Sequence, residues 1–201
     1  MADNYARIVR NNLDRICNNL SEQLALAVGG IQKDDAVLFD AFGESCRIAQ
    51  NAITLGGIEQ WSVIGIVLSL YALHAKPIDC KEQPFKAFKE FPNTMPYVGA
   101  FATHTEHILI SHSDRIEREL EKIAKQLNGE KNPTGISGDF SLIVRPLPKV
   151  ALCYIFYRAD EDFPASVTCL YSNNAAEFLP PDPLADLGEY TSKKILEIIA
   201  I

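Results

Sequence analysis

Hydrophobic residues recur every three or four positions in several stretches of the chain, which is the period of an amphipathic helix. This pattern predicts an N-terminal helix over 3–28, followed by a glycine pair that suits a helix end. The stretch 58–75 is apolar nearly all round and stops before a proline, so we expect a buried helix there. Helical patterns return over 97–127 and over 182–199.

Shorter apolar stretches bounded by turn residues predict strands over 36–42, 45–49, 140–145, 150–157 and 167–171. The fourth of these is apolar at nearly every position, so both of its faces should be covered. The order of helices and strands indicates the α+β class. We expect an antiparallel sheet of four to five strands packed with helices on one or both faces.

The bulk composition narrows the class of protein without changing this picture. The chain has 201 residues, 47% of them hydrophobic, which favours one domain over 1–201 with the helix 3–28 as an appendage. A net charge of −7 makes nucleic acid and anionic membrane poor partners, because a phosphate backbone would be repelled. The densest basic stretch, Lys122 to Lys125, is interleaved with Glu119 and Glu121.

Nothing in the N-terminal stretch has the apolar core of a signal peptide. The longest apolar run, 61–75, is about 15 residues, whereas a membrane span needs about 20. We therefore expect a cytoplasmic protein. Its five cysteines are odd in number and form no C-x-x-C pair, which is typical of free thiols in a reducing compartment.

Three of the four histidines lie in one short stretch, "HTEHILISH", which suggests a metal site. His104 and His107 are three residues apart and share a helix face, His112 follows, and Glu106 could add a carboxylate. The spacing is not H-E-x-x-H, in which two histidines four residues apart point at one metal. Histidines that are only hydrogen-bonded or solvated are the alternative.

The tip "ADED" between two apolar strands carries three adjacent acidic residues, Asp160 to Asp162. Adjacent carboxylates cannot easily face one cation, and calcium loops alternate their ligands around a glycine that is missing here. We expect a solvated hairpin turn. If the hairpin is centred near Glu161, Cys153 and Cys169 lie opposite each other, as a redox pair, a soft-metal site or packing residues, and a register shift of one would separate them.

A long loop between two helical stretches carries three phenylalanines, and long ordered loops often have a function. We expect a ligand pocket between this loop and the sheet, with aromatic walls and polar contacts from arginines at strand ends and one glutamate. Its predicted residues are Phe88, Glu90, Phe91, Tyr97, Arg145 and Arg158. No nucleotide-binding, hydrolase or kinase signature occurs in the chain.

Several motifs together resemble the uncharacterised family known as domain of unknown function 3786. They are "AVLFDAFGESCRIAQNAITLGG", "WSVIGIVLSLYALHAK", "FKAFKEFPNTMPYVGAF", "GDFSLIVRPLPKVALCYIFYRADEDFPASVTCLY" and "AAEFLPPDPLADLGEY", in that order over about 36–190. The resemblance implies a cytoplasmic protein of anaerobic bacteria or archaea. Because some relatives carry an added iron–sulfur domain, it also implies a redox or cofactor context. This chain has no cluster spacing, and the family supplies no catalytic residues.

The best functional hypothesis is an accessory protein of anaerobic metabolism that binds a small molecule or cofactor, or a redox protein partner. A metal-dependent enzyme using His104, His107 and His112 is the first alternative. An assembly protein that forms a homodimer through its first helix is the second. The residues alone identify neither the ligand nor the cofactor.

Overall fold

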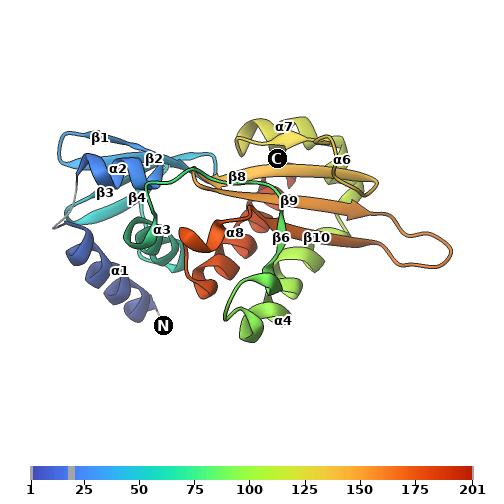
Figure 1. Ribbon diagram of the computed structural model, residues 1–201, viewed down its shortest axis with the longest axis horizontal. Coiled ribbons are helices and arrows are strands. Elements are labelled where there is room, and N and C mark those ends of the chain that lie inside the picture. Colours follow the sequence, from blue (N-terminus) through green and yellow to red (C-terminus); the bar gives the residue numbers. More distant parts are fainter. Residues whose placement is uncertain (1, 18–20, 201) are drawn as a thin grey trace.

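The computed structural model describes the backbone of residues 2–17 and 21–200, which form two antiparallel five-stranded sheets with helices around them (Figure 1). The α+β class predicted from the sequence is confirmed, but the strands divide into two sheets where one was expected. The first sheet has the order β1-β2-β3-β4-β5, and the second has the order β6-β10-β9-β8-β7.

The first half of the chain contains α1 (Ala2–Cys17), α2 (Glu22–Val28), β1 (Ile31–Lys33), β2 (Ala36–Ala41), β3 (Glu44–Ala49), β4 (Ala52–Leu55), β5 (Ile58–Glu59) and α3 (Val63–His74). The predicted single helix over 3–28 is therefore two helices. Ser21 caps the second one, its hydroxyl accepting from the backbone N–H of Leu24, and residues 18–20 lie outside the described part of the chain. The predicted helix over 58–75 begins only at Val63, because Ile58 and Glu59 pair with β4.

Helix α1 packs along α3, and its apolar stripe is used inside the chain. Val9, Leu13 and Ile16 are buried in the main core, and the side-chain amide of Asn12 donates to the Ser69 hydroxyl of α3 at 2.9 Å. The apolar stripe of α1 is thus packed inside the chain, while the outer face of the helix, with Asn4, Arg7 and Arg10, is exposed. The homodimer through this helix stays a prediction.

The second half of the chain contains β6 (Lys86–Ala87), η1 (Phe88–Glu90), η2 (Met95–Tyr97), α4 (Val98–Phe101), η3 (Ala102–His107), α5 (Ile108–Ile110), α6 (Ser113–Arg118), α7 (Leu120–Gln126), β7 (Glu130–Lys131), β8 (Phe140–Leu147), β9 (Val150–Tyr157), β10 (Ser166–Tyr171), η4 (Ala175–Glu177) and α8 (Pro181–Ala200). The helical pattern predicted over 97–127 is thus a series of short helices, and η3 is a π-helix. The strands predicted from the last third and the final helix are present, with ends shifted by a few residues.

The central strand β9 is buried on both faces, as its uninterrupted apolar sequence predicted. One face, with Leu152, Tyr154 and Phe156, belongs to the main core, to which α8 and η3 also contribute. The opposite face forms a second small cluster with Cys153, under the loop that joins α3 to β6 and under Ile136. Covering both faces with non-strand segments removes the need for alternating polar residues.

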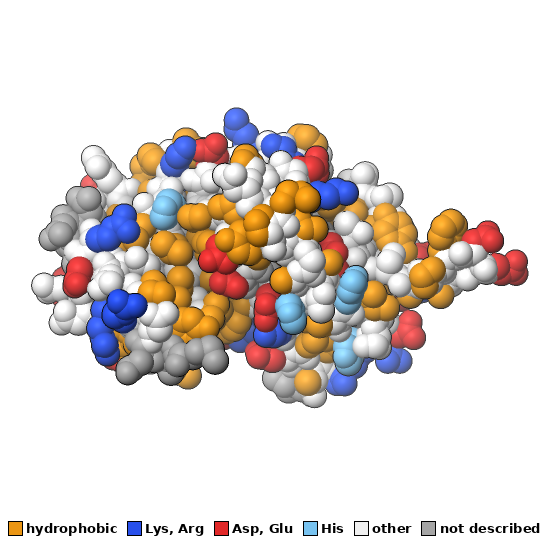
Figure 2. Space-filling model, turned by 90° about the horizontal axis from the view of Figure 1, so that it is seen from below, with side chains coloured by type: hydrophobic (Ala, Val, Ile, Leu, Met, Phe, Trp, Pro, Cys, Tyr) orange, Lys and Arg blue, Asp and Glu red, His pale blue; other side chains and the backbone are white. Residues whose placement is uncertain are grey.

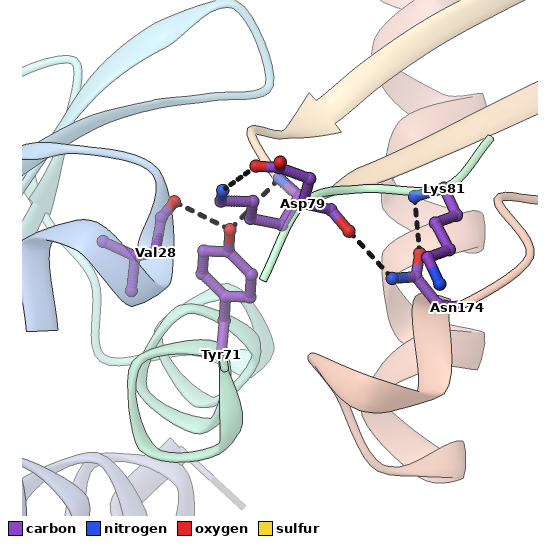
Figure 3. Close-up of polar contacts among 6 residues, drawn as sticks. Val28, Tyr71, Asp79, Lys81 and Asn174 are labelled. Atoms are coloured by element: carbon purple, nitrogen blue, oxygen red, sulfur yellow. Dashed lines mark hydrogen bonds and ion pairs between the residues drawn. The ribbon is translucent and has the colours of Figure 1, made fainter. Parts of the chain in front are cut away.

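The loop over 75–85 is fastened between the two halves of the molecule by polar contacts (Figure 3). The Asn174 amide donates to the backbone oxygen of Asp79 at 2.9 Å and accepts from the backbone N–H of Lys81 at 2.8 Å. Beside it, the Tyr71 hydroxyl donates to the backbone oxygen of Val28 at 2.8 Å, joining α3 to the end of α2. The loop is therefore an ordered cover for the outer face of the second sheet.

The turn between β2 and β3 connects the two sheets. Phe42 has a positive φ of 53°, which is unusual for a bulky residue, and Gly43 follows with φ of 77°. The backbone N–H of Phe42 donates to the oxygen of Pro146 in β8 at 2.8 Å, and its ring meets Tyr190 of α8 edge-on at 4.6 Å. A buried anchor on the second sheet and on α8 holds the turn in this conformation.

Candidate functional site

A pocket of about 230 Å³ lies where the sequence predicted one, between the second sheet and the phenylalanine-rich loop. It opens beside β10, η1 and the π-helix η3, and we call it the π-helix pocket. It is lined by Ala87, Phe88, Lys89, Val98, Phe101, Ala102, Glu106, Thr168 and Cys169. Most of the lining is apolar, with one carboxylate inside it and one exposed lysine at its rim, which is the composition of a small-molecule site.

The aromatic wall of the pocket is held by ring contacts in the core. Phe88 stacks on Phe101 with ring centroids 4.5 Å apart, and both rings lie about 6 Å from Tyr171, at 6.0 and 5.8 Å. Tyr171 is buried and donates its hydroxyl hydrogen to the backbone oxygen of Leu184 in α8 at 2.6 Å. Because these rings are fixed from behind, the wall is formed before any ligand arrives.

The π-helix η3 places Glu106 against the edge of β10. Strand β6 pairs only with Leu170 and Tyr171, so the outward-facing N–H of Cys169 has no strand partner. It donates to Oε1 of Glu106 at 2.9 Å, and the side chain thus takes the place of a neighbouring strand. A π-helix is a rare element that is frequent at functional sites, because the extra residue per turn re-aims side chains.

Burial raises the pKa of Glu106 above its usual value, and the hydrogen bond from Cys169 and the charge of His107 act against this shift. A half-buried carboxylate with one accepted hydrogen bond keeps acceptor capacity for a ligand donor. Carboxylates whose pKa is shifted by burial inside a cleft are candidates for a functional group.

A buried polar chain runs behind the pocket. The Tyr154 hydroxyl lies 3.0 Å from the Ser192 hydroxyl, which donates to the backbone oxygen of Thr105 in η3 at 2.8 Å. Cys169 is hydrogen-bonded to Tyr154, and burial holds the pKa of this thiol well above its usual value. The thiol therefore stays protonated near neutral pH, which favours a packing role over a nucleophilic one.

Among the described residues, the hydroxyl of Thr105 is a buried polar atom without a hydrogen-bond partner. It points toward α8, where a Cβ added to Gly188 would come within 3.1 Å of it. Buried hydroxyls normally find a partner, so this site carries a small energetic penalty at the centre of the π-helix. Gly188 permits the close approach, because a Cβ there would also lie 2.6 Å from Phe101 and from the Tyr171 hydroxyl.

Of the six residues predicted to bind a ligand, only Phe88 lines this pocket. Phe91 is buried against Tyr171 at its ring edge, and Tyr97 is half-buried at the periphery of the core. Glu90 caps η1, its carboxylate accepting from the N–H of Ala87 at 2.6 Å. Two of the predicted loop residues therefore serve the core, and one serves the helix end.

The two predicted arginines lie at opposite ends of the second sheet and do not reach the pocket. Arg145 forms an ion pair with Glu82 and donates to the oxygen of Asn128 at 3.0 Å. Arg158 pairs with Glu117, 2.5 Å from its carboxylate. Both arginines are thus paired with acidic side chains of this chain.

The three histidines do not assemble the predicted metal site. His104, His107 and His112 are exposed, because the series of short helices turns them toward solvent. Across residues 2–17 and 21–200, no group of three His, Cys, Asp or Glu side chains is placed to hold a metal ion. Glu106, predicted as the fourth ligand, instead faces the π-helix pocket.

The cysteine pair predicted on the hairpin is separated by a register shift of one. Cys169 pairs with Tyr154, and Cys153 pairs with Leu170, so the two thiols face opposite sides of the sheet. Cys153 lies in the outer cluster, where burial raises its pKa to about 12, and Cys169 lies in the main core. A redox pair or shared soft metal between them is excluded by this geometry.

A larger hollow of about 600 Å³ lies between the β2–β3 turn, α7 and the end of α8. Two of the lysines that line it are engaged, since Lys194 pairs with Glu44 and Lys122 donates to the backbone oxygen of Ile198 at 2.8 Å. Lys122 therefore places a positive charge at the C-terminal end of α8, where it compensates the helix dipole. We therefore place the functional site at the smaller π-helix pocket, where a carboxylate is partly desolvated.

Most of the chain matches one protein family. Residues 21–194 match the family described as domain of unknown function (DUF3786). No curated protein and no solved structure matched the sequence. Within the described residues, none of the helices combines the length and the apolar character needed to span a bilayer. Because the match covers most of its length, the chain belongs to the DUF3786 family.

Proposed function

We propose that the protein binds a small molecule in the π-helix pocket, as an accessory protein of the cytoplasm in anaerobic metabolism. The observation that carries the proposal is Glu106, a half-buried carboxylate with a raised pKa inside an aromatic-walled pocket. A ligand with an apolar body and one positively charged hydrogen-bond donor would satisfy both parts of the site. At about 230 Å³ the pocket suits a compact molecule.

The arrangement supports binding more than catalysis. Cys169 lines the pocket but is protonated, and the nearby Tyr154 and Tyr171 hydroxyls have pKa values raised well above normal by burial. Each of these groups is also held in a hydrogen bond within the core. Glu106 is left as the carboxylate of the pocket, and its charged form suits recognition of a cation.

The proposal is tested with three probes of one shape, benzylamine, benzyl alcohol and benzoate, titrated into the purified protein at pH 8 and followed by amide NMR. We expect benzylamine to shift the amides of Phe88, Ala102 and Cys169, and the other two probes to bind at least about tenfold more weakly, because charge-assisted hydrogen bonds contribute about 1.5–3 kcal/mol.

The variant Glu106→Gln should lose the preference for benzylamine, whereas Glu130→Gln, the same charge change on the exposed strand β7, should keep it. Binding to the unaltered protein should weaken as the pH is lowered from 8, because Glu106 is protonated as the pH falls through its raised pKa. Equal binding of all three probes, or equal losses in the two variants, would reject the proposed site.

A further inference from the structure

The hairpin of β9 and β10 extends past the body of the protein (Figure 1), and its tip is the projecting end in Figure 2. The strands pair from Leu152 with Tyr171 as far as Tyr157 with Ser166, and residues 158–164 beyond them are all exposed. The sequence predicted a solvated turn here, and the structure agrees. Its exposure alone leaves unexplained why the turn carries a large aromatic residue.

The turn is held in one conformation by its own hydrogen bonds. Oδ1 of Asp160 accepts from the backbone N–H groups of Asp162 and Phe163 at 2.9 and 2.7 Å. The N–H of Asp160 donates to the backbone oxygen of Phe163 at 3.0 Å. At the base, the N–H of Arg158 donates to Asp139 at 2.7 Å. The tip is therefore pre-organised, and its side chains are presented at fixed positions.

The fixed tip exposes apolar surface that nothing in the described chain covers. Phe163 is 70% exposed and Tyr157 is 38% exposed, and the exposed Pro164 follows Phe163. They share a shallow hollow of about 510 Å³, lined by Asp139, Tyr157, Arg158, Asp160, Phe163, Pro164 and Ser166. Exposed aromatic residues on a rigid support are the usual anchors of protein interfaces.

The charges around this surface indicate what kind of partner fits it. Asp160, Glu161 and Asp162 are exposed at the tip, and Arg158, the one nearby cation of the turn, is already paired with Glu117. A second copy of the chain would bring another acidic tip and a net charge of −7, which disfavours self-association. Basic side chains around an apolar recess would complement the tip instead.

We propose that the β9–β10 tip docks into a partner protein, with Phe163 inserted into an apolar recess that is rimmed by lysine or arginine. Phe163 and Pro164 fill the recess, and the three carboxylates orient the approach and accelerate the encounter. The contact is small and partly electrostatic, so it is a reversible one. It is separate from the π-helix pocket and does not depend on a ligand there.

The full-length protein, expressed in its own host, is tested with the photo-crosslinking residue p-benzoylphenylalanine in place of Phe163. A matched control carries the same residue in place of Met95, which is 74% exposed at η2. We expect one discrete protein adduct from position 163 and not from position 95, with a crosslinked peptide that contains apolar residues and lysine or arginine.

The captured protein is then purified and its affinity for the unlabelled chain is measured by calorimetry. We expect Phe163→Ser to weaken binding at least tenfold, an order of magnitude that is usual for loss of an aromatic anchor, while Met95→Ser leaves it unchanged. The pair of changes Glu161→Lys and Asp162→Lys should weaken binding by a similar factor. Raising the salt from about 0.05 M to about 0.5 M should weaken it too.

The four substitutions, at positions 95, 161, 162 and 163, all change exposed side chains outside the core, so circular dichroism should show an unaltered fold in each variant. Absence of an adduct above the position 95 control would overturn the proposal. So would an adduct with a second copy of the same chain, or binding to the captured protein that neither salt nor the lysine substitutions weaken.

Discussion

The two sheets of this protein are built in different ways, although each has five antiparallel strands. The first sheet is a meander within residues 31–59, and each strand pairs with the next one along the chain. The second sheet combines β6 at residue 86 with β10 at residue 171, and β9 lies between β10 and β8. The first sheet contains only pairings between consecutive strands, whereas the second adds one distant pairing, β6 with β10, to the consecutive strands β7 to β10.

The difference explains why the candidate site lies at the second sheet. Strand β10 is covered by the two-residue edge strand β6 along only part of its length, so a segment from elsewhere, η3, supplies Glu106 beside the rest of it. In the first sheet the two-residue turns close each hairpin locally, as at Gly56 and Gly57 with φ of 57° and 81°. A locally closed meander leaves fewer places where distant side chains must meet.

The largest expected effect tests whether the two sheets unfold together. Phe156 of β9 is buried and stacks on Phe140 with centroids 4.4 Å apart, so Phe156→Ala should lower the free energy of unfolding by about 3–5 kcal/mol. One continuous core includes residues of both sheets. We therefore expect the first sheet to be destabilised by the same amount as the second.

The measurement is urea unfolding followed by circular dichroism and by the fluorescence of Trp61, the single tryptophan, which lies between β5 and α3. Both signals should shift by the same amount in Phe156→Ala. A Trp61 transition that stays in place while circular dichroism changes in two steps would contradict the single domain that the sequence predicted over 1–201.

A smaller loss of stability distinguishes the crowded packing of α8 behind the second sheet from the open turns of the first sheet. Gly188→Ala should destabilise the protein by about 2 kcal/mol, because the new Cβ meets Phe101 and Tyr171 at 2.6 Å in a packed core. Gly57→Ala should cost about 1 kcal/mol through its φ of 81° alone, since nothing lies within 4 Å of that position.

Thermal unfolding of both glycine variants checks which of the two is destabilised more. Titration with benzylamine checks whether the strain in each variant reaches the π-helix pocket. Only Gly188→Ala should reduce benzylamine binding, because displacement of Phe101 changes the pocket wall. Equal binding by both variants would show that the wall is not fixed by α8.

The smallest effect concerns the junction of α3 and α8, where Asp186 lies in a hollow with Val63, Ile64 and Tyr190. Burial, with help from the charges of Asp182 and Glu189, raises the pKa of Asp186 to about 6. The folded state therefore holds the proton more tightly than the unfolded chain does. The associated stability is present below pH 4 and is lost as the pH rises through about 6.

Asp186→Asn should remove this loss and raise the free energy of unfolding at pH 8 by about 1 kcal/mol, a value reduced for partial exposure. At pH 4 the variant and the unaltered protein should be nearly equal. Urea unfolding at the two pH values is the measurement, and a gain of the same size at both would assign the effect to packing.

The sequence predicted the five strands of six or more residues and the ends of several helices, because those depend on local periodicity and turn residues, whereas the five shorter strands were missed. The apolar strand 150–157 and the helix beginning near Asp182 are examples. It could not predict the π-helix, since an extra residue in one turn leaves no period in "ATHTEH" that differs from an ordinary helix. It also joined 3–28 into one helix, although Ser21 was available as a cap.

Of the residues predicted to bind a ligand, the π-helix pocket has only Phe88 in its lining. Phe88 was found because aromatic side chains in a long loop are a local signal, whereas Glu106 was assigned to a metal because its neighbours are histidines. The predicted pairing of Cys153 with Cys169 was wrong by one position, since the register of a hairpin is set by its turn and by the face that packs on the core. Contacts across tens of residues carry no marker in the sequence of either partner.

The sequence by itself determined the class of the fold, the longer strands β2, β3, β8, β9 and β10 and the solvated acidic tip, since short-range polarity decides which segments are buried. Only the tertiary structure decided that η3 meets β10 and that α8 backs the pocket through Gly188. The physical reason is that the pKa of Glu106 depends on burial, and burial is created by residues that are distant along the chain.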